Sequence, residues 1–228
     1  MSVQARSIAS SLIGVPTLPP QSETATRYAH NVDYALITDR AAFDALEPEW
    51  NALFARAGRP IQVFQSFNWN WHWANHYLAS SQGGIAGLEL SIVIARRNGQ
   101  LIAVWPLVSE RQHGVSQIFW MGDPVTQYGD VVIDDIPDAL AVMRGGWEYL
   151  VTHAKADVVR LRRVRDDAAV APLMTDIGAY IADRLKAPYL NLASAPDFAK
   201  YEERYSGHAR RNRRRLTRRL EDRGAIVF

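Results

Sequence analysis

The alternation of apolar and polar residues is clearest in residues 88–133, where it predicts β-strands joined by tight turns. Residues 88–97 are rich in β-branched side chains, and Asn98-Gly99 follows them as a strong hairpin signal. The chain returns through residues 100–109 and rises again through residues 115–121. Both hairpin strands are apolar on both faces, so we expect helices before and after this run to cover each face of the sheet.

Helical periodicity dominates the sequence on both sides of these strands. Residues 41–57 place apolar side chains three and four apart, and Asp39 is a suitable cap at their start. Residues 67–80 repeat the pattern with Ser66 as the cap, and residues 137–153 form a third helical segment. We therefore predict an α/β (α+β) fold with a mixed, largely antiparallel central sheet flanked by helices.

The two ends of the chain have weaker patterns. Residues 1–27 contain three prolines and scattered serines, and we predict a disordered tail there. Residues 157–164 alternate as a half-buried strand does, whereas residues 166–184 are typical of a helix interrupted by Pro172 and Gly178.

The predicted helix 67–80 is unusually aromatic. One face carries Phe67 and Trp71, and a second face carries Trp69, Trp73 and Tyr77. Burial in the core explains such aromatics, since each contributes roughly 2–3 kcal/mol when it is removed from water. The alternative is that Trp69 or Trp73 lines a ligand cleft, and both remain candidates for substrate binding.

A loop rich in glycine and proline follows the third strand and contains Asp123, Tyr128 and Asp130. A carboxylate and a phenol at the edge of a sheet can orient a substrate amine or hydroxyl, or move a proton. Asp and Tyr also stabilise loops through ordinary hydrogen bonds, so both interpretations remain open. Tyr128 and Asp130 are the candidates for substrate binding here.

The charge of the chain is unevenly distributed. Residues 208–219 hold seven arginines and no acid, so a formal net charge of +2 leaves about −5 for the rest. The arginines surround a predicted packed face, and Arg210, Arg211 and Arg214 are candidates for binding an anion. Three interpretations remain open: the helix is purely structural, it binds an anionic small molecule or cofactor, or it makes a peripheral membrane contact. Nucleic acid binding is disfavoured, because no aromatic residues are interleaved for base stacking.

Composition excludes several chemistries. The absence of cysteine rules out disulfides, thiolate metal sites and a cysteine nucleophile, and it fits a reducing, cytoplasmic compartment. No apolar run reaches the ~18 residues that a membrane span needs. His72 and His76 lack a third ligand, so we expect no metal site. The turn at residues 111–116 partly matches the R/Q-x-x-G-x-G/A loop that cradles a CoA pyrophosphate, but a strand follows it, so we interpret it as a hairpin turn.

Several short motifs, taken in order, resemble one family. They are Glu49-Trp50-Asn51, Phe64-Gln65-Ser66 with Trp69 and Trp73, Asn98-Gly99-Gln100-Leu101, Tyr128-Gly129-Asp130, and the arginine helix that leads to Gly224. Together they are similar to the GNAT-like acyltransferases of the CelD type, associated with bacterial cellulose and exopolysaccharide biosynthesis, and to the Fem-type transferases with two tandem GNAT units.

This resemblance implies a GNAT-like domain over residues 28–195 and the start of a second, truncated one over residues 196–228. It implies transfer of an acyl group from acyl-CoA, such as acetyl-CoA, to an amine or hydroxyl on a small-molecule, glycan or peptide acceptor. The acyl-CoA would be bound mainly by sequence that follows residue 228, and no catalytic residue can be assigned in this half. The competing hypothesis is a non-catalytic binding or scaffolding domain that docks an anionic partner through the arginine helix.

Overall fold

The computed structural model describes residues 5–14, 31–78, 85, 87–188 and 191–225. The chain divides into two compact units. We call Ser7–Lys186 the sheet unit, and Met1–Arg6 with Ala187–Phe228 the terminal unit. The predicted start of a second domain at residue 196 lies inside the terminal unit.

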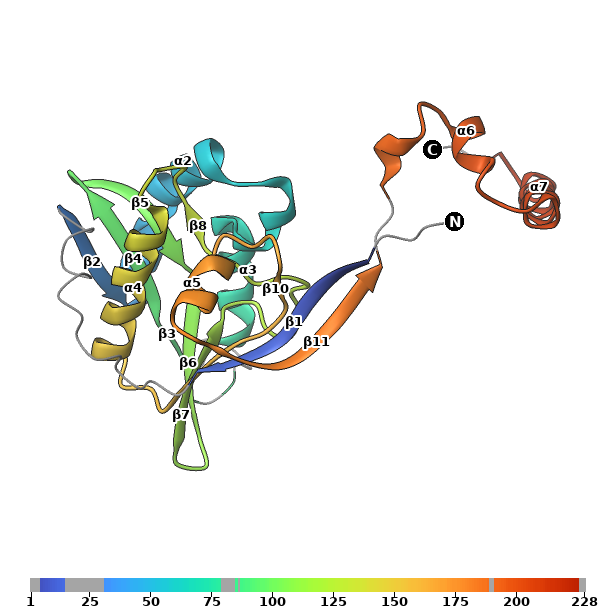
Figure 1. Cartoon of the computed structure of the whole chain (residues 1–228). Coiled ribbons are helices and arrows are strands. Elements are labelled where there is room, and N and C mark those ends of the chain that lie inside the picture. Colours follow the sequence, from blue (N-terminus) through green and yellow to red (C-terminus); the bar gives the residue numbers. More distant parts are fainter. Residues whose placement is uncertain (1–4, 15–30, 79–84, 86, 189–190, 226–228) are drawn as a thin grey trace. The chain divides into compact units, whose positions relative to one another are not determined.

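Two β-sheets form the centre of the sheet unit (Figure 1). Over the described residues, one sheet has seven strands in the order β10-β1-β9-β7-β6-β3 with β11 against β1, and the other has the order β2-β4-β5-β8. The strands are β1 (Ala5–Gly14), β2 (Val32–Ile37), β3 (Leu88–Leu90), β4 (Ile92–Arg97), β5 (Gln100–Trp105), β6 (Leu107–Gln112), β7 (Val115–Trp120), β8 (Val132–Ile133), β9 (Val158–Leu161), β10 (Val164–Arg165) and β11 (Tyr180–Pro188).

The helices of the sheet unit flank these sheets: α1 (Arg40–Ala45), α2 (Glu47–Ala57), α3 (Phe67–Tyr77), α4 (Ala139–His153) and α5 (Ala171–Asp176), with the 3-10 turn η2 (Pro60–Gln65). The terminal unit contains the 3-10 turn η3 (Leu192–Ser194) and the helices α6 (Phe198–Glu202) and α7 (Gly207–Glu221). Strands β7 and β9 are parallel, and the neighbouring pair β6 and β7 is antiparallel, as is the pair β4 and β5. The predicted α/β class with a mixed, largely antiparallel sheet is confirmed.

Each of the two long predicted strands is divided between the sheets. The first breaks at Ser91 into β3 and β4, and the second breaks at Pro106 into β5 and β6. Proline has no N–H to donate to a strand neighbour, so the ladder is interrupted there. The backbone N–H of Ser91 donates to the carbonyl of Leu107 (3.0 Å), and that of Met121 donates to Pro106 (2.8 Å), which joins the sheets at the break.

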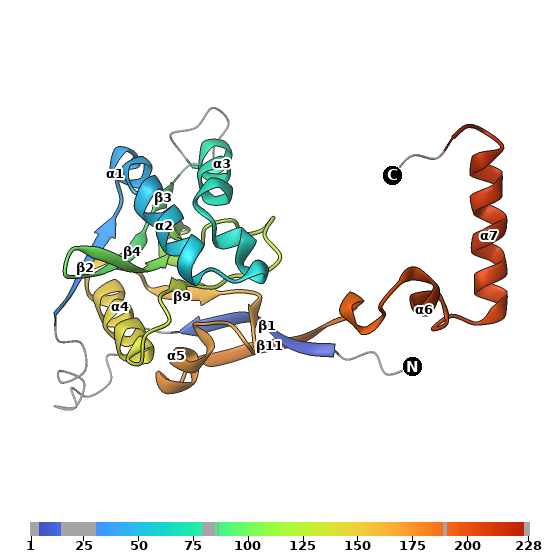
Figure 2. The same ribbon diagram turned by 90° about the horizontal axis from the view of Figure 1, so that it is seen from above.

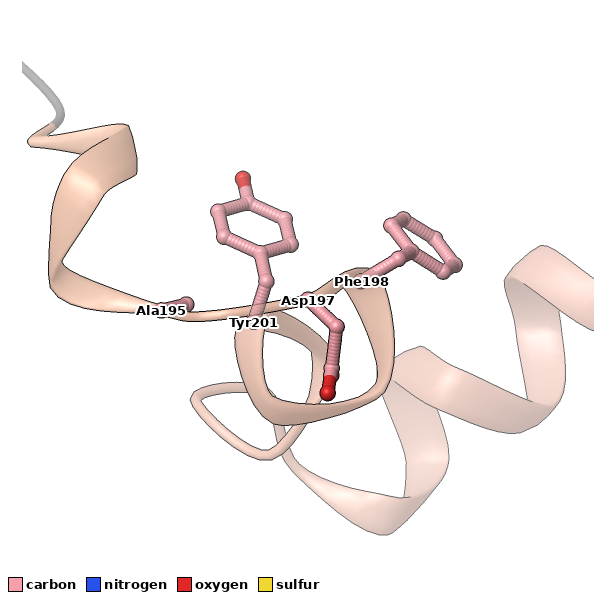
Figure 3. A pocket seen from close by; sticks show the side chains of 4 residues that line it. All are labelled: Ala195, Asp197, Phe198 and Tyr201. Atoms are coloured by element: carbon pink, nitrogen blue, oxygen red, sulfur yellow. The ribbon is translucent and has the colours of Figure 1, made fainter.

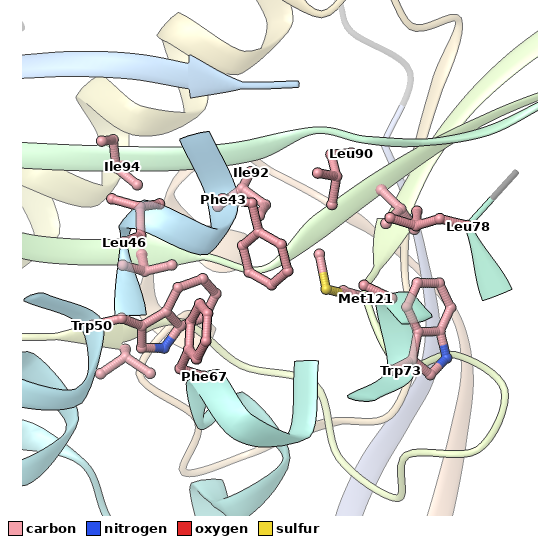
Figure 4. Packing of buried hydrophobic residues seen from close by; sticks show 14 of the residues in the cluster. Phe43, Leu46, Trp50, Phe67, Trp73, Leu78, Leu90, Ile92, Ile94 and Met121 are labelled. Carbon is pink, nitrogen blue, oxygen red and sulfur yellow. The ribbon is translucent and has the colours of Figure 1, made fainter. Parts of the chain in front are cut away.

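Helices cover both faces of the sheets, as the two-sided apolar strands predict (Figure 2). Helices α1, α2 and α3 bury Phe43, Trp50, Phe67 and Trp73 against strands β3 to β7 (Figure 4). Helices α4 and α5 bury a second cluster, which includes Trp147, on the other side of the strands. The hairpin turn at Asn98-Gly99 has two positive φ angles, 52° and 79°, which this tight turn requires.

Three sequence predictions are corrected by the structure. Within the predicted tail, Ala5–Gly14 is strand β1, because β9 and β10 supply hydrogen-bonding partners for its backbone. The predicted helix 166–184 is the short α5 followed by β11, since Gly178 takes a φ of +64° and ends the helix. The predicted helix 41–57 is two helices, with the break at Leu46 just before Pro48.

The paired glycines of α4 have different surroundings. Tyr34 of β2 packs against the helix at Gly145, where an added Cβ would lie 2.6 Å from Tyr34 Cζ. The Tyr34 hydroxyl donates to the carbonyl of Val142 (3.0 Å), and burial raises its pKa to about 12. At Gly146 the nearest atom would be Trp105 Nε1 at 3.4 Å, an ordinary contact. Gly145 is therefore required by packing, and Gly146 is not.

We predict opposite effects for alanine at these adjacent positions. Gly145→Ala should lower the free energy of unfolding by about 1–3 kcal/mol, because Tyr34 must move away from its carbonyl partner. Gly146→Ala should leave it unchanged or raise it by up to about 1 kcal/mol, the usual gain for alanine in a helix. Urea denaturation of the two variants measures both values, and equal effects would contradict this packing.

Candidate functional site

Two of the predicted substrate-binding residues are brought together by a third aromatic ring. Phe64 of η2 lies edge-to-face with Trp69 of α3, with ring centroids 5.0 Å apart, and also contacts Tyr128, at 6.5 Å. All three side chains are half-buried. We call Phe64, Trp69 and Tyr128 the aromatic cluster; it forms a partly exposed apolar surface beside the loop that follows β7.

A guanidinium group borders this cluster. Arg165 of β10 lies over the Tyr128 ring at 5.2 Å, a cation–π distance. It is held by Asp167, whose Oδ1 lies 2.8 Å from Arg165 Nε, and this hydrogen bond raises the pKa of the arginine. The sequence provides no signal for Arg165, because it is one of several arginines in residues 160–165.

The indole groups of α3 differ in their surroundings. Trp73 is 3% exposed and stacks on Tyr77 with centroids 5.1 Å apart, so it belongs to the core, the first of the two interpretations of the aromatic helix. Trp69 is only half-buried, yet its Nε1–H is enclosed and meets no acceptor among the described residues. An enclosed donor without a partner costs about 1–3 kcal/mol. Trp69 is therefore the tryptophan of the pair that has ring surface to offer a ligand, while its enclosed N–H lies away from the surface.

Asp130 lies beneath the cluster and is 4% exposed. Its two carboxylate oxygens accept hydrogen bonds from five donors at 2.7–3.0 Å. The donors are the backbone N–H groups of Val131, Ala169 and Val170, the side-chain amide of Gln62, and the guanidinium of Arg59.

These hydrogen bonds connect three segments to one carboxylate: η2 with the residue before it, the loop before β8, and the residues that precede α5. Burial raises the pKa of the Asp130 carboxyl above its ordinary value, and the backbone and amide donors act against that rise. With its oxygens occupied, Asp130 positions the loop and does not meet a substrate. Arg59 and Gln62 were not identified from sequence, because the contact joins residues about seventy positions apart.

The loop between β7 and β8 packs closely against Trp120 at Gly129, which lies between Tyr128 and Asp130. A Cβ on Gly129 would lie 2.7 Å from Trp120 Cγ, so the indole ring of Trp120 fills the space where a side chain would begin. The side-chain amide of Gln65 donates to the carbonyl of Tyr128 at 2.9 Å. Tyr128 is thus held through its backbone, and its ring is presented at the surface.

The three arginines predicted to bind an anion lie on α7, in the terminal unit. Arg211 and Arg214 are exposed, Arg210 is half-buried, and no acidic side chain among the described residues pairs with them. The expected packed face of this helix is not buried in the structure: Leu216 is 46% exposed and Leu220 59%. This part of the prediction is corrected, because none of the described residues of the terminal unit covers these two leucines.

The terminal unit contains a pocket of about 420 Å³ (Figure 3). It is lined by Ala195, Asp197, Phe198 and Tyr201. The Asp197 carboxylate already accepts from the backbone N–H of Lys200 (2.7 Å) as the cap of α6. The pocket is a shallow hollow beside one short helix turn, and none of the predicted site residues lines it.

Two further sequence candidates lie in the turn between β6 and β7 and on the surface of α3. Residues 111–116 form the turn between β6 and β7, with Gln112 paired to Val115 and a φ of +83° at Gly114. A strand follows, so this turn does not fit a CoA pyrophosphate. His72 and His76 are exposed, and the described residues contain no group of three or more possible metal ligands. Across the described part of the chain, no helix is long and apolar enough to cross a bilayer.

No protein-family model matches the sequence, and neither does any curated protein. Among solved structures, the chain is similar to the C-terminal DUF2156 domain of a protein named as a lysylphosphatidylglycerol synthetase from Agrobacterium fabrum. The identity is 9% over 71% of this chain and 49% of that one, with a TM-score of 0.39. A GCN5-related N-acetyltransferase from Kribbella flavida is similar at 13% identity, over 84% of this chain and 61% of that one, with a TM-score of 0.33.

The chain therefore spans about half to three-fifths of the length of these two structures. With TM-scores below 0.5, neither likeness carries an argument about this chain. The α/β class of this chain follows from its own sheets and helices.

We predict that Asp130→Asn will lower the free energy of unfolding by about 2–4 kcal/mol. An amide presents N–H where the carboxylate accepts, and it leaves buried donors without partners. Asp138→Asn is the control, because Asp138 also pairs with an arginine, Arg97, but is 32% exposed; it should cost about 1 kcal/mol or less. Chemical denaturation at pH 7 compares them, and a cost for Asp130→Asn no larger than the control's would show that Asp130 does not fasten the loop.

Proposed function

We propose that this chain is the N-terminal portion of a GNAT-like acyltransferase, and that the sheet unit holds the acceptor. The full reaction would transfer an acyl group from acyl-CoA to an amine or hydroxyl, in envelope or exopolysaccharide metabolism such as that of cellulose. The observation that carries the proposal is the aromatic cluster, in which two motif residues, Trp69 and Tyr128, meet through Phe64. The ordered motifs that resemble the CelD type support it.

The residues of the cluster suit an acceptor rather than an acyl donor. The half-exposed rings provide an apolar surface, the Tyr128 hydroxyl provides a polar group, and Arg165 limits one side. Such a mixture of apolar surface and a few polar groups is typical of small-molecule sites. Asp130 would position the loop without touching the acceptor, because all its hydrogen bonds are used within the fold.

Acyl-CoA is proposed to bind mainly to sequence that follows residue 228. The turn at residues 111–116 does not fit its pyrophosphate, and the resemblance implies that the acyl-CoA unit begins only at about residue 196. Without a cysteine nucleophile, direct transfer to the acceptor is the expected route.

The second candidate function is a binding or scaffolding domain that docks an anionic partner through α7. It is favoured by one observation, the arginines of α7 that have no acidic partner among the described residues. The salt dependence of binding distinguishes the two candidate functions. Binding driven by several phosphates falls steeply with rising salt, whereas an aromatic acceptor surface is far less sensitive.

Calorimetric titration with amino sugars, amino acids and glucan oligosaccharides tests the proposal. We expect at least one of them to bind, with an affinity that changes less than about threefold between 50 and 300 mM salt. Trp69→Leu should weaken that binding at least 10-fold, because it removes the aromatic ring surface on which the acceptor would pack.

Trp71→Leu is the matched control on the same helix. Trp71 is also half-buried, but its Nε1–H donates to Asp44 (3.0 Å), and it lies outside the cluster. It should leave the affinity unchanged. If none of the acceptors binds, or if Trp71→Leu weakens binding as much as Trp69→Leu, the cluster is not the acceptor site.

A further inference from the structure

Helix α7 has two kinds of exposed surface on opposite sides. Leu216 and Leu220 are four residues apart and form an apolar stripe that none of the described residues of the terminal unit covers. At about 100° per residue, Arg211 and Arg218 lie roughly 140° or more from both leucines, on the far side of the helix. Arg210 and Arg219 lie on the two flanks of the stripe, roughly 60–120° from the leucines. The helix is therefore strongly amphipathic, with arginine at the flanks as well as opposite the stripe.

One arginine of the helix has a structural role. Arg213 lies over the Tyr205 ring at 3.9 Å and forms an ion pair with Glu202 at 3.0 Å, which anchors α7 to the segment before it. Among the described residues, the other six have no acidic partner: Arg210, Arg211, Arg214, Arg215, Arg218 and Arg219. These six guanidinium groups are therefore free of acidic partners within the described structure and available to an anionic surface.

The pattern restricts the chemistry of that partner. A nucleic acid would neutralise the arginines but leave Leu216 and Leu220 in water. A bilayer with anionic headgroups meets both surfaces, because acyl chains accept the leucines while phosphates face the flanking arginines. A helix with a charged face, low overall hydrophobicity and a narrow apolar stripe is the kind that lies in the plane of a membrane interface.

We propose that α7 docks the protein on the surface of an anionic bilayer. The stripe of Leu216 and Leu220 faces the acyl chains, and Arg210 and Arg219 reach the headgroup phosphates from either side. Arg211 and Arg218 face away, across a helix whose diameter with side chains is about 10–12 Å. At physiological salt the screening length is about 8 Å, so these distant charges contribute little. This interaction is independent of the acceptor site proposed for the sheet unit.

Co-sedimentation with vesicles tests the docking. The whole chain is mixed at 0.15 M salt with vesicles of equal parts phosphatidylglycerol and phosphatidylcholine, and with vesicles of phosphatidylcholine alone. We expect sedimentation with the first only. Arg210→Gln with Arg219→Gln should weaken partitioning roughly 30-fold, since each arginine near an anionic surface contributes about a factor of five. Leu216→Gln with Leu220→Gln should weaken it at least 10-fold, since both apolar side chains are lost.

The matched control removes the same charge from the far side of the same helix. Arg211→Gln with Arg218→Gln should weaken partitioning less than about fivefold. Circular dichroism of each variant checks that helix content is kept. Failure to sediment with anionic vesicles overturns the proposal. A second result also overturns it: the two arginine double variants weaken partitioning equally, and the leucine double variant does not weaken it. That result indicates a partner recognised by charge alone, such as a nucleic acid.

Discussion

The buried carboxylate of Asp130 is the interaction on which the arrangement of the sheet unit depends. It receives five hydrogen bonds, and it ties η2, the loop before β8 and the residues before α5 to one point. Removing a carboxylate from water is costly, and only a full set of donors offsets that cost. Because Phe64 and Tyr128 belong to two of the tied segments, the same carboxylate determines where the aromatic cluster forms.

A second constraint is the break in the two long strands. Pro106 cannot donate a ladder hydrogen bond, and Ser91 is the break opposite, so the chain passes from one sheet to the other there. The two sheets together present apolar side chains on both faces, and α1 to α3 on one side and α4 with α5 on the other bury them. The rigid core that results allows a connecting loop to present Tyr128 with its backbone held in place.

The two units differ in the way they meet their surroundings. Residues 7–186 have 15 basic and 19 acidic side chains, and most of their arginines near the core are paired. Residues 187–228 have 10 basic and 5 acidic side chains, and most of the arginines of α7 are unpaired among the described residues. We therefore propose that the sheet unit binds a small-molecule acceptor and that the terminal unit binds an anionic surface. The two binding sites use different residues.

The sequence by itself determined the α/β class, the hairpin at Asn98-Gly99, the caps Asp39 and Ser66, and the two-sided burial of the central strands, because each depends on residues close together in the chain. Only the tertiary structure decided that Trp73 is in the core while Trp69 contacts Phe64, which in turn contacts Tyr128, since helical periodicity places both tryptophans on one face. It also decided that Asp130 is occupied by donors from Arg59 and Val170, and that residues 180–188 are a strand. These outcomes depend on partners far away in sequence, and no local pattern encodes which distant donor or strand will satisfy a backbone or a buried charge.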